Sequence, residues 1–145
     1  MSYQKLVAAA QKAKRFSYSP FSKFKVGAAV VTRSGTIYTG CNIEISSFAL
    51  TICAERTALF KAVSEGERNF VAVAIASGGS ALTPPCGACR QVLMDLAGDI
   101  DVVMTNHRGK KRVMRLRDLF PHPFRATNFI QRKKRTGQNP SRENK

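Results

Sequence analysis

The chain has 145 residues, of which 43% are hydrophobic and 23% charged, a composition that is typical of one globular domain and excludes a disordered or fibrous protein. No apolar run approaches the roughly 20 residues that span a membrane, and the N-terminal residues do not follow the pattern of a secretory signal, so we expect a cytoplasmic protein. The formal net charge is +15, of which +6 lies from Arg125 onward, where seven Lys and Arg residues accompany a single acidic residue, Glu143.

The predicted elements alternate between helices and strands. Apolar residues at helical spacing predict a first helix over residues 2–15, and Pro20 predicts an ordered loop after it. Near-continuous apolar runs predict buried strands, and a turn at Ser34 and Gly35 joins the first two strands into a hairpin. The predicted strands cover residues 26–32, 36–40, 70–77, 101–105 and 112–116, and the later helices cover residues 53–64 and 87–96.

This alternation predicts an α/β fold, a three-layer α/β/α sandwich around a mixed sheet of about five strands. The segment between residues 42 and 51 mixes polar with apolar residues and is expected to be irregular. The hydrophobic pattern fades after Phe124, so we predict one domain over residues 1–124 and a basic tail over residues 125–145.

Three of the four cysteines fall in two short stretches, residues 53–55 (Cys-Ala-Glu) and 85–89 (Pro-Cys-Gly-Ala-Cys), each at the predicted start of a helix. Unpaired N–H groups at a helix N-terminus lower the pKa of a thiol and favour the thiolate, which is the form that binds metals. Three thiolates suit zinc far better than calcium or magnesium. We therefore expect Cys53, Cys86 and Cys89 to bind one zinc ion.

This predicted zinc site offers three protein ligands. Cys41 lies in the strand region, where we expect a small buried apolar residue, and His107 and His122 are distant in sequence and are expected on the surface. A catalytic zinc keeps its fourth position for water, whereas a structural zinc is usually closed by four protein ligands. The incomplete set favours catalysis, with a structural site as the alternative.

Glu55 and Arg56 complete the predicted chemistry. Glu55 lies in the first helical turn beside the metal, where it is expected to take a proton from the zinc-bound water and pass it to the substrate and a leaving amine. Three thiolates on a dication leave a net charge of −1. Arg56, three residues after Cys53, is expected to donate to the ligand sulfurs and offset that charge, while an ordinary surface position remains the alternative.

Several longer motifs accompany the two cysteine stretches. They are residues 18–29 (YSPFSKFKVGAA), 40–44 (GCNIE), 53–58 (CAERTA), 86–93 (CGACRQVL) and 119–124 (LFPHPF). The two cysteine stretches match the all-cysteine version of the zinc-deaminase signature. With the longer motifs, the chain resembles the small homotetrameric cytidine deaminases over roughly residues 1–124. The resemblance implies that family's fold, one Zn²⁺ per chain, a homotetramer, and hydrolytic deamination of cytidine and deoxycytidine to uridine and deoxyuridine plus ammonia in pyrimidine salvage.

The resemblance also implies the residues that contact the substrate. Asn42 and Glu44 would hold the ribose hydroxyl, and Phe24 would stack on the pyrimidine. Phe124 from a neighbouring subunit would help to close the pocket. The backbone of Ala54 and the loop that carries the second cysteine stretch would read the edge of the base.

One segment departs from the family pattern. The family usually continues after Glu44 with Asn, small residues and a Tyr that reaches a neighbouring active site, whereas residues 45–48 here are Ile-Ser-Ser-Phe. Phe48 keeps the aromatic ring without the hydroxyl, so a hydrogen bond to the 5′ end of the sugar, with a net value of about 0.5–1.5 kcal/mol, is lost. We expect altered ribose recognition with the deamination chemistry intact.

Three other functions remain open from the sequence. The first is a deaminase whose substrate is a different aminopyrimidine nucleoside, including a base-modified cytidine or a nucleoside antibiotic of the blasticidin type. A nucleic-acid-binding or base-editing protein would use the basic tail, in which Phe129 alone is available to stack on bases. A zinc-stabilised scaffold without activity is disfavoured by Glu55. The expected partners are a nucleoside and further copies of the chain, with nucleic acid less favoured and no membrane.

Overall fold

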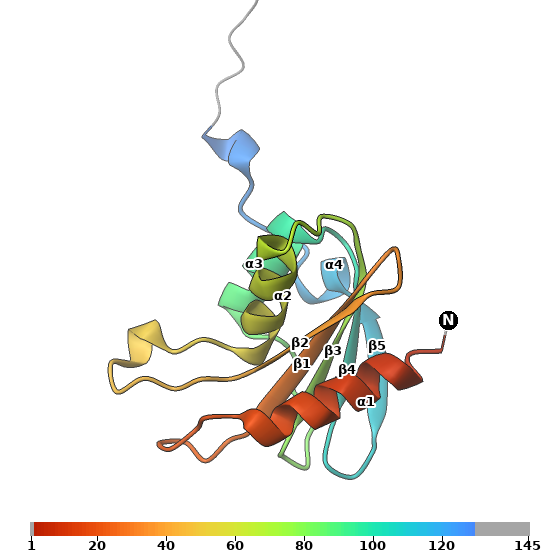
Figure 1. Cartoon of the computed structure of the whole chain (residues 1–145). Coiled ribbons are helices and arrows are strands. Elements are labelled where there is room, and N and C mark those ends of the chain that lie inside the picture. Colours follow the sequence, from red (N-terminus) through yellow and green to blue (C-terminus); the bar gives the residue numbers. More distant parts are fainter. Residues whose placement is uncertain (1, 130–145) are drawn as a thin grey trace, which may run out of the picture.

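The buried apolar runs of the sequence pair into one mixed sheet in the computed structural model, which describes residues 2–129 (Figure 1). The order across the sheet is β2-β1-β3-β4-β5. Neighbouring strands are antiparallel except β3 and β4, which are parallel. The strands are β1 (Val26–Thr32), β2 (Ile37–Cys41), β3 (Phe70–Ser77), β4 (Asp101–Thr105) and β5 (Lys111–Arg115).

Helices cover both faces of this sheet, which confirms the predicted three-layer α/β/α sandwich with five strands (Figure 1). Helix α1 lies against one face, and α2 and α3 lie against the other, with the short α4 following β5. The helices are α1 (Gln4–Ala13), α2 (Ala54–Ser64), α3 (Gly87–Leu96) and α4 (Leu116–Leu119), and 3₁₀ turns cover Lys14–Phe16, Phe48–Leu50 and Ala126–Asn128.

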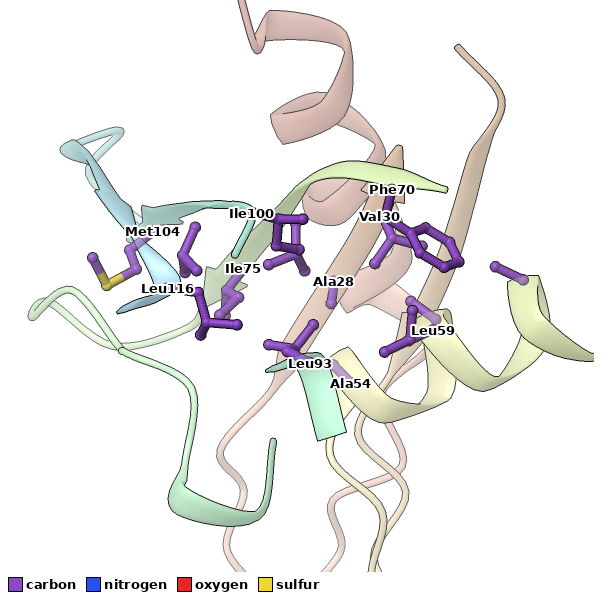
Figure 2. Close-up of a cluster of buried hydrophobic side chains, with 14 of the residues drawn as sticks. Ala28, Val30, Ala54, Leu59, Phe70, Ile75, Leu93, Ile100, Met104 and Leu116 are labelled. Atoms are coloured by element: carbon purple, nitrogen blue, oxygen red, sulfur yellow. The ribbon is translucent and has the colours of Figure 1, made fainter. Parts of the chain in front are cut away.

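The central strand β3 divides the core between the two faces by residue size. Its alanines Ala72, Ala74 and Ala76 face α1, whereas Val73 and Ile75 face α2 and α3. Because side chains alternate between the faces of a strand, β3 builds a shallow layer of alanines toward α1 and a deep layer of larger side chains toward α2 and α3. In Figure 2 the deep layer contains leucines from three helices, Leu59, Leu93 and Leu116.

Two glycines of the sheet let helices approach the strands closely. A Cβ atom on Gly27 of β1 would lie 2.2 Å from the carbonyl oxygen of Ala10 in α1. A Cβ atom on Gly40 of β2 would lie 2.4 Å from the backbone nitrogen of Ala58 in α2. Contacts this short are impossible for any other residue, so these two positions determine how closely α1 and α2 pack on the sheet.

The predicted boundaries differ from the structure mainly at helix and strand ends. Helix α1 stops at Ala13 and tightens into a 3₁₀ turn, and the predicted irregular segment contains the turn Phe48–Leu50. Leu116, predicted as the end of a strand, begins α4 and is completely buried, and its N–H donates to the carbonyl of Ile100. Residues 130–145, most of the predicted tail, lie outside the described residues, so the boundary after Phe124 stays a prediction.

In the part of the chain that the structure describes, no helix has the length and apolarity that a membrane crossing requires.

Candidate functional site

The N-termini of α2 and α3 meet on the same side of the sheet, and each begins directly after a cysteine. Cys53 is the N-cap residue of α2 and Cys86 is the N-cap residue of α3, both with extended backbone angles. Pro85, which lacks an N–H, precedes the second cap and keeps the helix from starting earlier. Cys89 lies one turn into α3 with its side chain buried. Each cysteine stretch therefore lies at the start of a helix, as predicted, and the two starts lie together.

The three cysteine sulfurs form a cluster with the geometry of a zinc site. Their Sγ atoms all lie within 4.8 Å of one another, and those of Cys53 and Cys86 are 3.8 Å apart. Tetrahedral coordination with Zn–S bonds of about 2.3 Å places neighbouring sulfurs about 3.8 Å apart. Within residues 2–129 the cluster contains these three groups and no fourth His, Cys, Asp or Glu. The donor set fits a zinc ion with one position left for another ligand.

Hydrogen bonds among the sulfurs and from Arg56 shift the pKa values of the thiols in the cluster. Hydrogen bonds from Cys89, Arg56 and Cys86 lower the pKa of the Cys53 thiol to about 5. The hydrogen bond between Cys89 and Cys53, together with burial, raises the pKa of Cys89, because the proton stays on that sulfur. The lowered pKa favours the thiolate form of Cys53. Thiolate is the form in which cysteine binds zinc.

Arg56 lies beside the cluster, as the helical spacing predicted. Its Nη2 atom donates to Sγ of Cys53 at 3.4 Å. Burial alone would lower the pKa of this guanidinium, yet hydrogen bonds to Cys53 and Cys89 raise it above its ordinary value. The position of Arg56 is therefore one in which its charge compensates the sulfurs.

Glu55 is a buried carboxyl next to the sulfurs. Its exposed fraction is 5%, and burial, reinforced by the charge of Cys53, raises the pKa of this group to about 7. A carboxyl with a pKa near neutrality both takes and gives up a proton at neutral pH. The raised pKa is the property expected of an acid and base for catalysis.

A cavity of about 270 Å³ opens over the cluster. It lies where the predicted metal, proton-transfer and substrate residues meet. Its lining comes from β1, the loop before β1, the segment after β2, the start of α2, β3 and the loop before α3. Of the predicted residues, its walls include Phe24, Asn42, Glu44, Cys53, Ala54, Glu55 and Cys86. Four of the five sequence motifs quoted for the resemblance therefore converge on one pocket, and the motif over residues 119–124 does not reach it.

Glu44 is held at the pocket wall by the loop before β1. The Ser22 hydroxyl donates to its Oε1, and the N–H groups of Phe21 and Ser22 donate to its Oε2 at 2.9 and 3.2 Å. These bonds, with that from the Ser22 hydroxyl as the largest, lower the pKa of Glu44. The carboxylate is thus ionised and fixed in direction, which suits it to accept a hydrogen bond from a hydroxyl group.

Asn42 ties three segments of the pocket together. Its Oδ1 accepts from the hydroxyl of Ser17 at 2.5 Å and from the N–H of Val26 at 2.9 Å. Its Nδ2 donates to the carbonyl of Phe24 at 2.8 Å. One N–H of the amide stays available for a ligand. Sequence reasoning missed that Ser17 and Ser22 support Asn42 and Glu44, although Ser22 lies within a quoted motif.

Phe48 and Phe124 do not line the pocket of their own chain. Phe48 is 64% exposed and meets Phe21 edge to face, with ring centroids 5.4 Å apart. Phe124 is 61% exposed and stacks on Phe129, while its backbone pairs with the side chain of Gln91. Each ring thus has one aromatic neighbour and is otherwise exposed on the surface of the single chain.

A larger cavity of about 570 Å³ lies elsewhere, between α1, β2 and α2. Its walls include Cys41, whose thiol donates to the carbonyl of Phe16 at 3.3 Å. Cys41 was predicted to be buried, and the structure shows it half-buried. The only metal-binding cluster among the described residues lies at the smaller cavity. Chemistry, rather than size, therefore identifies the smaller cavity as the functional site.

Comparison with known proteins agrees with this site. The family model described as "Cytidine and deoxycytidylate deaminase zinc-binding region" matches residues 1–105. The chain is 46% identical to a cytidine deaminase of Sporosarcina psychrophila over 125 residues, which cover 86% of this chain and 92% of that protein. It is 44% identical to a cytidine deaminase of Halalkalibacterium halodurans over 130 residues, which cover 89% of this chain and 98% of that protein.

Solved structures give the same result. The crystal structure of cytidine deaminase from Burkholderia pseudomallei matches with a TM-score of 0.83 and 45% identity, covering 86% of this chain and 100% of that one. The crystal structure of cytidine deaminase from Mycobacterium tuberculosis matches with a TM-score of 0.74 and 35% identity, covering 86% of this chain and 98% of that one.

Proposed function

We propose, from the premise that this chain belongs to the cytidine and deoxycytidylate deaminase family, that Cys53, Cys86 and Cys89 hold its zinc ion and that Glu55 carries its protons. As a member of that family the protein is a zinc-dependent hydrolase that converts cytidine and deoxycytidine to uridine and deoxyuridine with release of ammonia. The observation that carries the site assignment is a buried carboxyl, with its pKa near neutrality, beside three clustered sulfurs in one cavity.

Proton transfer is the task of Glu55. When bound, zinc supplies a Lewis acid that lowers the pKa of a coordinated water to about 7. Glu55 takes one proton from the attacking water and delivers it to the ring nitrogen of the pyrimidine. A second proton, from the hydroxyl now on the attacked carbon, then passes through Glu55 to the amine, so that the C–N bond breaks, the carbonyl forms and ammonia leaves. Its burial excludes bulk water from this exchange, and its pKa of about 7 lets it act in both directions.

Substrate binding is the task of the walls around Glu55. We assign the stacking surface for the pyrimidine to Phe24 and the sugar hydroxyl contact to Asn42 and Glu44, all of which line the cavity. The N–H of Ala54 belongs to the first turn of α2, whose N–H groups have no partner within the helix. That N–H is suited to read an acceptor on the edge of the base.

A homotetramer is proposed for the assembly. Phe48 and Phe124 are more than half exposed in the single chain, although large aromatic side chains are usually covered. A partner chain that covers them would bring a ring to the mouth of a neighbouring pocket. The proposal predicts that the molecular mass in solution is four times 15.9 kDa.

A cytoplasmic location is proposed from the cysteines. All four cysteines are unpaired thiols, and three of them form the metal cluster. Thiols of this kind persist in a reducing compartment, whereas secreted proteins usually oxidise them.

A second candidate substrate is a modified aminopyrimidine nucleoside, and residues 45–48 favour it. Phe48 supplies no hydroxyl, and its contact is the apolar ring of Phe21. An ammonia-release assay across cytidine, deoxycytidine, base-modified cytidines and a blasticidin-type nucleoside tests both candidates. We expect the highest kcat/KM with cytidine or deoxycytidine; a hundredfold preference for a modified nucleoside would replace this assignment.

A further inference from the structure

Side chains of the loop that follows β4 form hydrogen bonds with the backbone of the loop that follows β3. Because β3 and β4 are parallel neighbours, their carboxyl ends lie at the same edge of the sheet, and the loops that leave them run side by side (Figure 1). The first of these loops leads from Ser77 through two glycines to Thr83 and Pro84 in the pocket wall. The second begins with Asn106 and His107.

Asn106 holds both loops with one side chain. It is 97% buried, since its exposed fraction is 3%. Its Oδ1 accepts from the N–H groups of Arg108 and Lys110 at 3.0 and 2.9 Å, which closes its own turn. Its Nδ2 donates to the carbonyl of Ser80 in the other loop.

The side chain of His107 binds Gly79, the residue before Ser80. Its Nδ1 lies 2.7 Å from the carbonyl oxygen of Gly79. A carbonyl only accepts, so Nδ1 must carry the hydrogen, and this is possible in both the neutral and the charged imidazole. Two consecutive carbonyls of the first loop, those of Gly79 and Ser80, are therefore bound by two consecutive side chains of the second.

The held segment lies directly against Phe24, the proposed stacking surface for the pyrimidine. A Cβ atom built on Gly79 would lie 3.4 Å from Cε2 of the Phe24 ring. The N–H of Gly78 donates to the carbonyl of Lys25 at 2.9 Å, which joins the loop to the segment that carries Phe24. Gly79 therefore lies beside the ring of Phe24, and Gly78 is bonded to the residue that follows Phe24.

We propose that His107 is a positioning residue for substrate binding, which acts through Gly79 to hold the ring of Phe24 against the bound base, with Asn106 as its buried anchor. This inference rests on the proposed role of Phe24. Stacking on the base is made in the ground state and in the transition state alike. Loss of the His107 contact therefore raises KM and leaves kcat nearly unchanged.

Steady-state kinetics on the zinc-loaded protein test this proposal. His107→Ala removes one hydrogen bond and is expected to raise KM for cytidine by about two- to tenfold, with kcat within about twofold of wild type. His107→Asn keeps an N–H donor near the position of Nδ1 and is expected to restore KM. Arg108→Ala, in the same exposed turn, is the matched control and should leave both constants unchanged.

A double variant separates positioning from general loosening. In a Phe24→Leu background, where the stacking ring is absent, adding His107→Ala should leave KM where Phe24→Leu alone puts it. An unchanged KM in the single His107→Ala variant, failure of His107→Asn to restore KM, or a full His107→Ala effect in the Phe24→Leu background would each overturn the proposal. A wild-type protein that releases no ammonia from any nucleoside would instead overturn the proposed function, so the two failures are distinguishable.

Discussion

The guanidinium Nη2 of Arg56 lies 3.4 Å from the sulfur of Cys53, one helical turn after it. A cation that donates to a metal-binding thiolate withdraws charge from it and so makes the metal a stronger acid. Three thiolates would carry more negative charge than one zinc ion balances, and we propose that Arg56 offsets the excess.

Replacing that cation should slow the reaction without emptying the site. For Arg56→Gln we expect kcat for cytidine to fall about 10- to 100-fold, because the sulfurs lose a partner that tunes the metal. Metal analysis should still give one zinc per chain. Arg56→Lys keeps the charge and should recover part of the loss. Wild-type kcat in Arg56→Gln with full zinc content would show that the charge is not used.

Removing the proton carrier should abolish turnover and keep the metal. Positioned acid and base groups contribute about 10²–10⁴-fold to a rate, so we expect at least that loss of kcat in Glu55→Ala. Zinc content and the thermal midpoint of unfolding are the controls, since neither depends on proton transfer. An active, zinc-loaded Glu55→Ala protein would contradict the role proposed for this carboxyl.

Restoring a hydroxyl at position 48 should improve recognition of one end of the sugar. In Phe48→Tyr we expect KM for cytidine to fall about two- to tenfold, which corresponds to one gained hydrogen bond. The KM for 5′-deoxycytidine, which lacks the partner hydroxyl, should stay unchanged. Equal effects on both nucleosides, or no effect on either, would argue against a 5′ contact at this position.

A hydrogen bond between helix α1 and strand β4 should make stability depend on pH. The hydroxyl of Tyr3 donates to Oδ2 of Asp101 at 2.5 Å, and Arg115 donates to Oδ1 at 2.9 Å. The bond from Tyr3 is the main reason that the pKa of Asp101 is lowered, and burial followed by this bond raises the pKa of Tyr3 to about 12.

The two shifts act at opposite ends of the pH range. The folded pKa of Asp101 is depressed, so its contribution is present above the unfolded value of about 3.9 and is lost as pH falls through the folded pKa. The folded pKa of Tyr3 is raised, so its contribution is complete below the unfolded value of about 10 and is lost as pH rises through about 12.

The variant Tyr3→Phe tests this bond directly. We expect it to lower the free energy of unfolding by about 1 kcal/mol at pH 7, and the difference from wild type should shrink as pH falls below the folded pKa of Asp101. Urea unfolding at several pH values measures it, with Tyr18→Phe, a 60% exposed tyrosine, as the control. A difference that is constant from pH 7 to pH 2 would exclude the Asp101 contact as its cause.

Much of this arrangement was readable from sequence because it follows from local rules. Strand β3 begins and ends where its apolar run predicted, helix α3 begins after the prolines that predicted its start, and the caps of α2 and α3 carry the cysteines as expected. Spacing along a helix also predicted the contact of Arg56 with Cys53. Each of these depends on residues that are close in the chain.

The contacts that the sequence did not reveal join residues far apart in the chain. The sequence around His107 indicates a surface loop and no partner for its side chain. The parallel pairing of β3 and β4 brings it to Gly79. Leu116 looked like a strand residue because apolar neighbours precede it, yet it begins α4 and is completely buried in the same cluster as Leu93. Tertiary packing decided both cases.

The alanine face of β3 has a consequence for how this enzyme can change over generations. Ala72, Ala74 and Ala76 pack in one cluster with Leu6 and Ala10 of α1, and α1 leads through the turn Lys14–Phe16 into the segment that carries Phe24. Overpacking a well-filled core forces side chains and backbone to shift, so a larger side chain on that face is expected to displace α1. We expect such substitutions, on the face of the sheet opposite the pocket, to alter substrate recognition without any contact with the substrate.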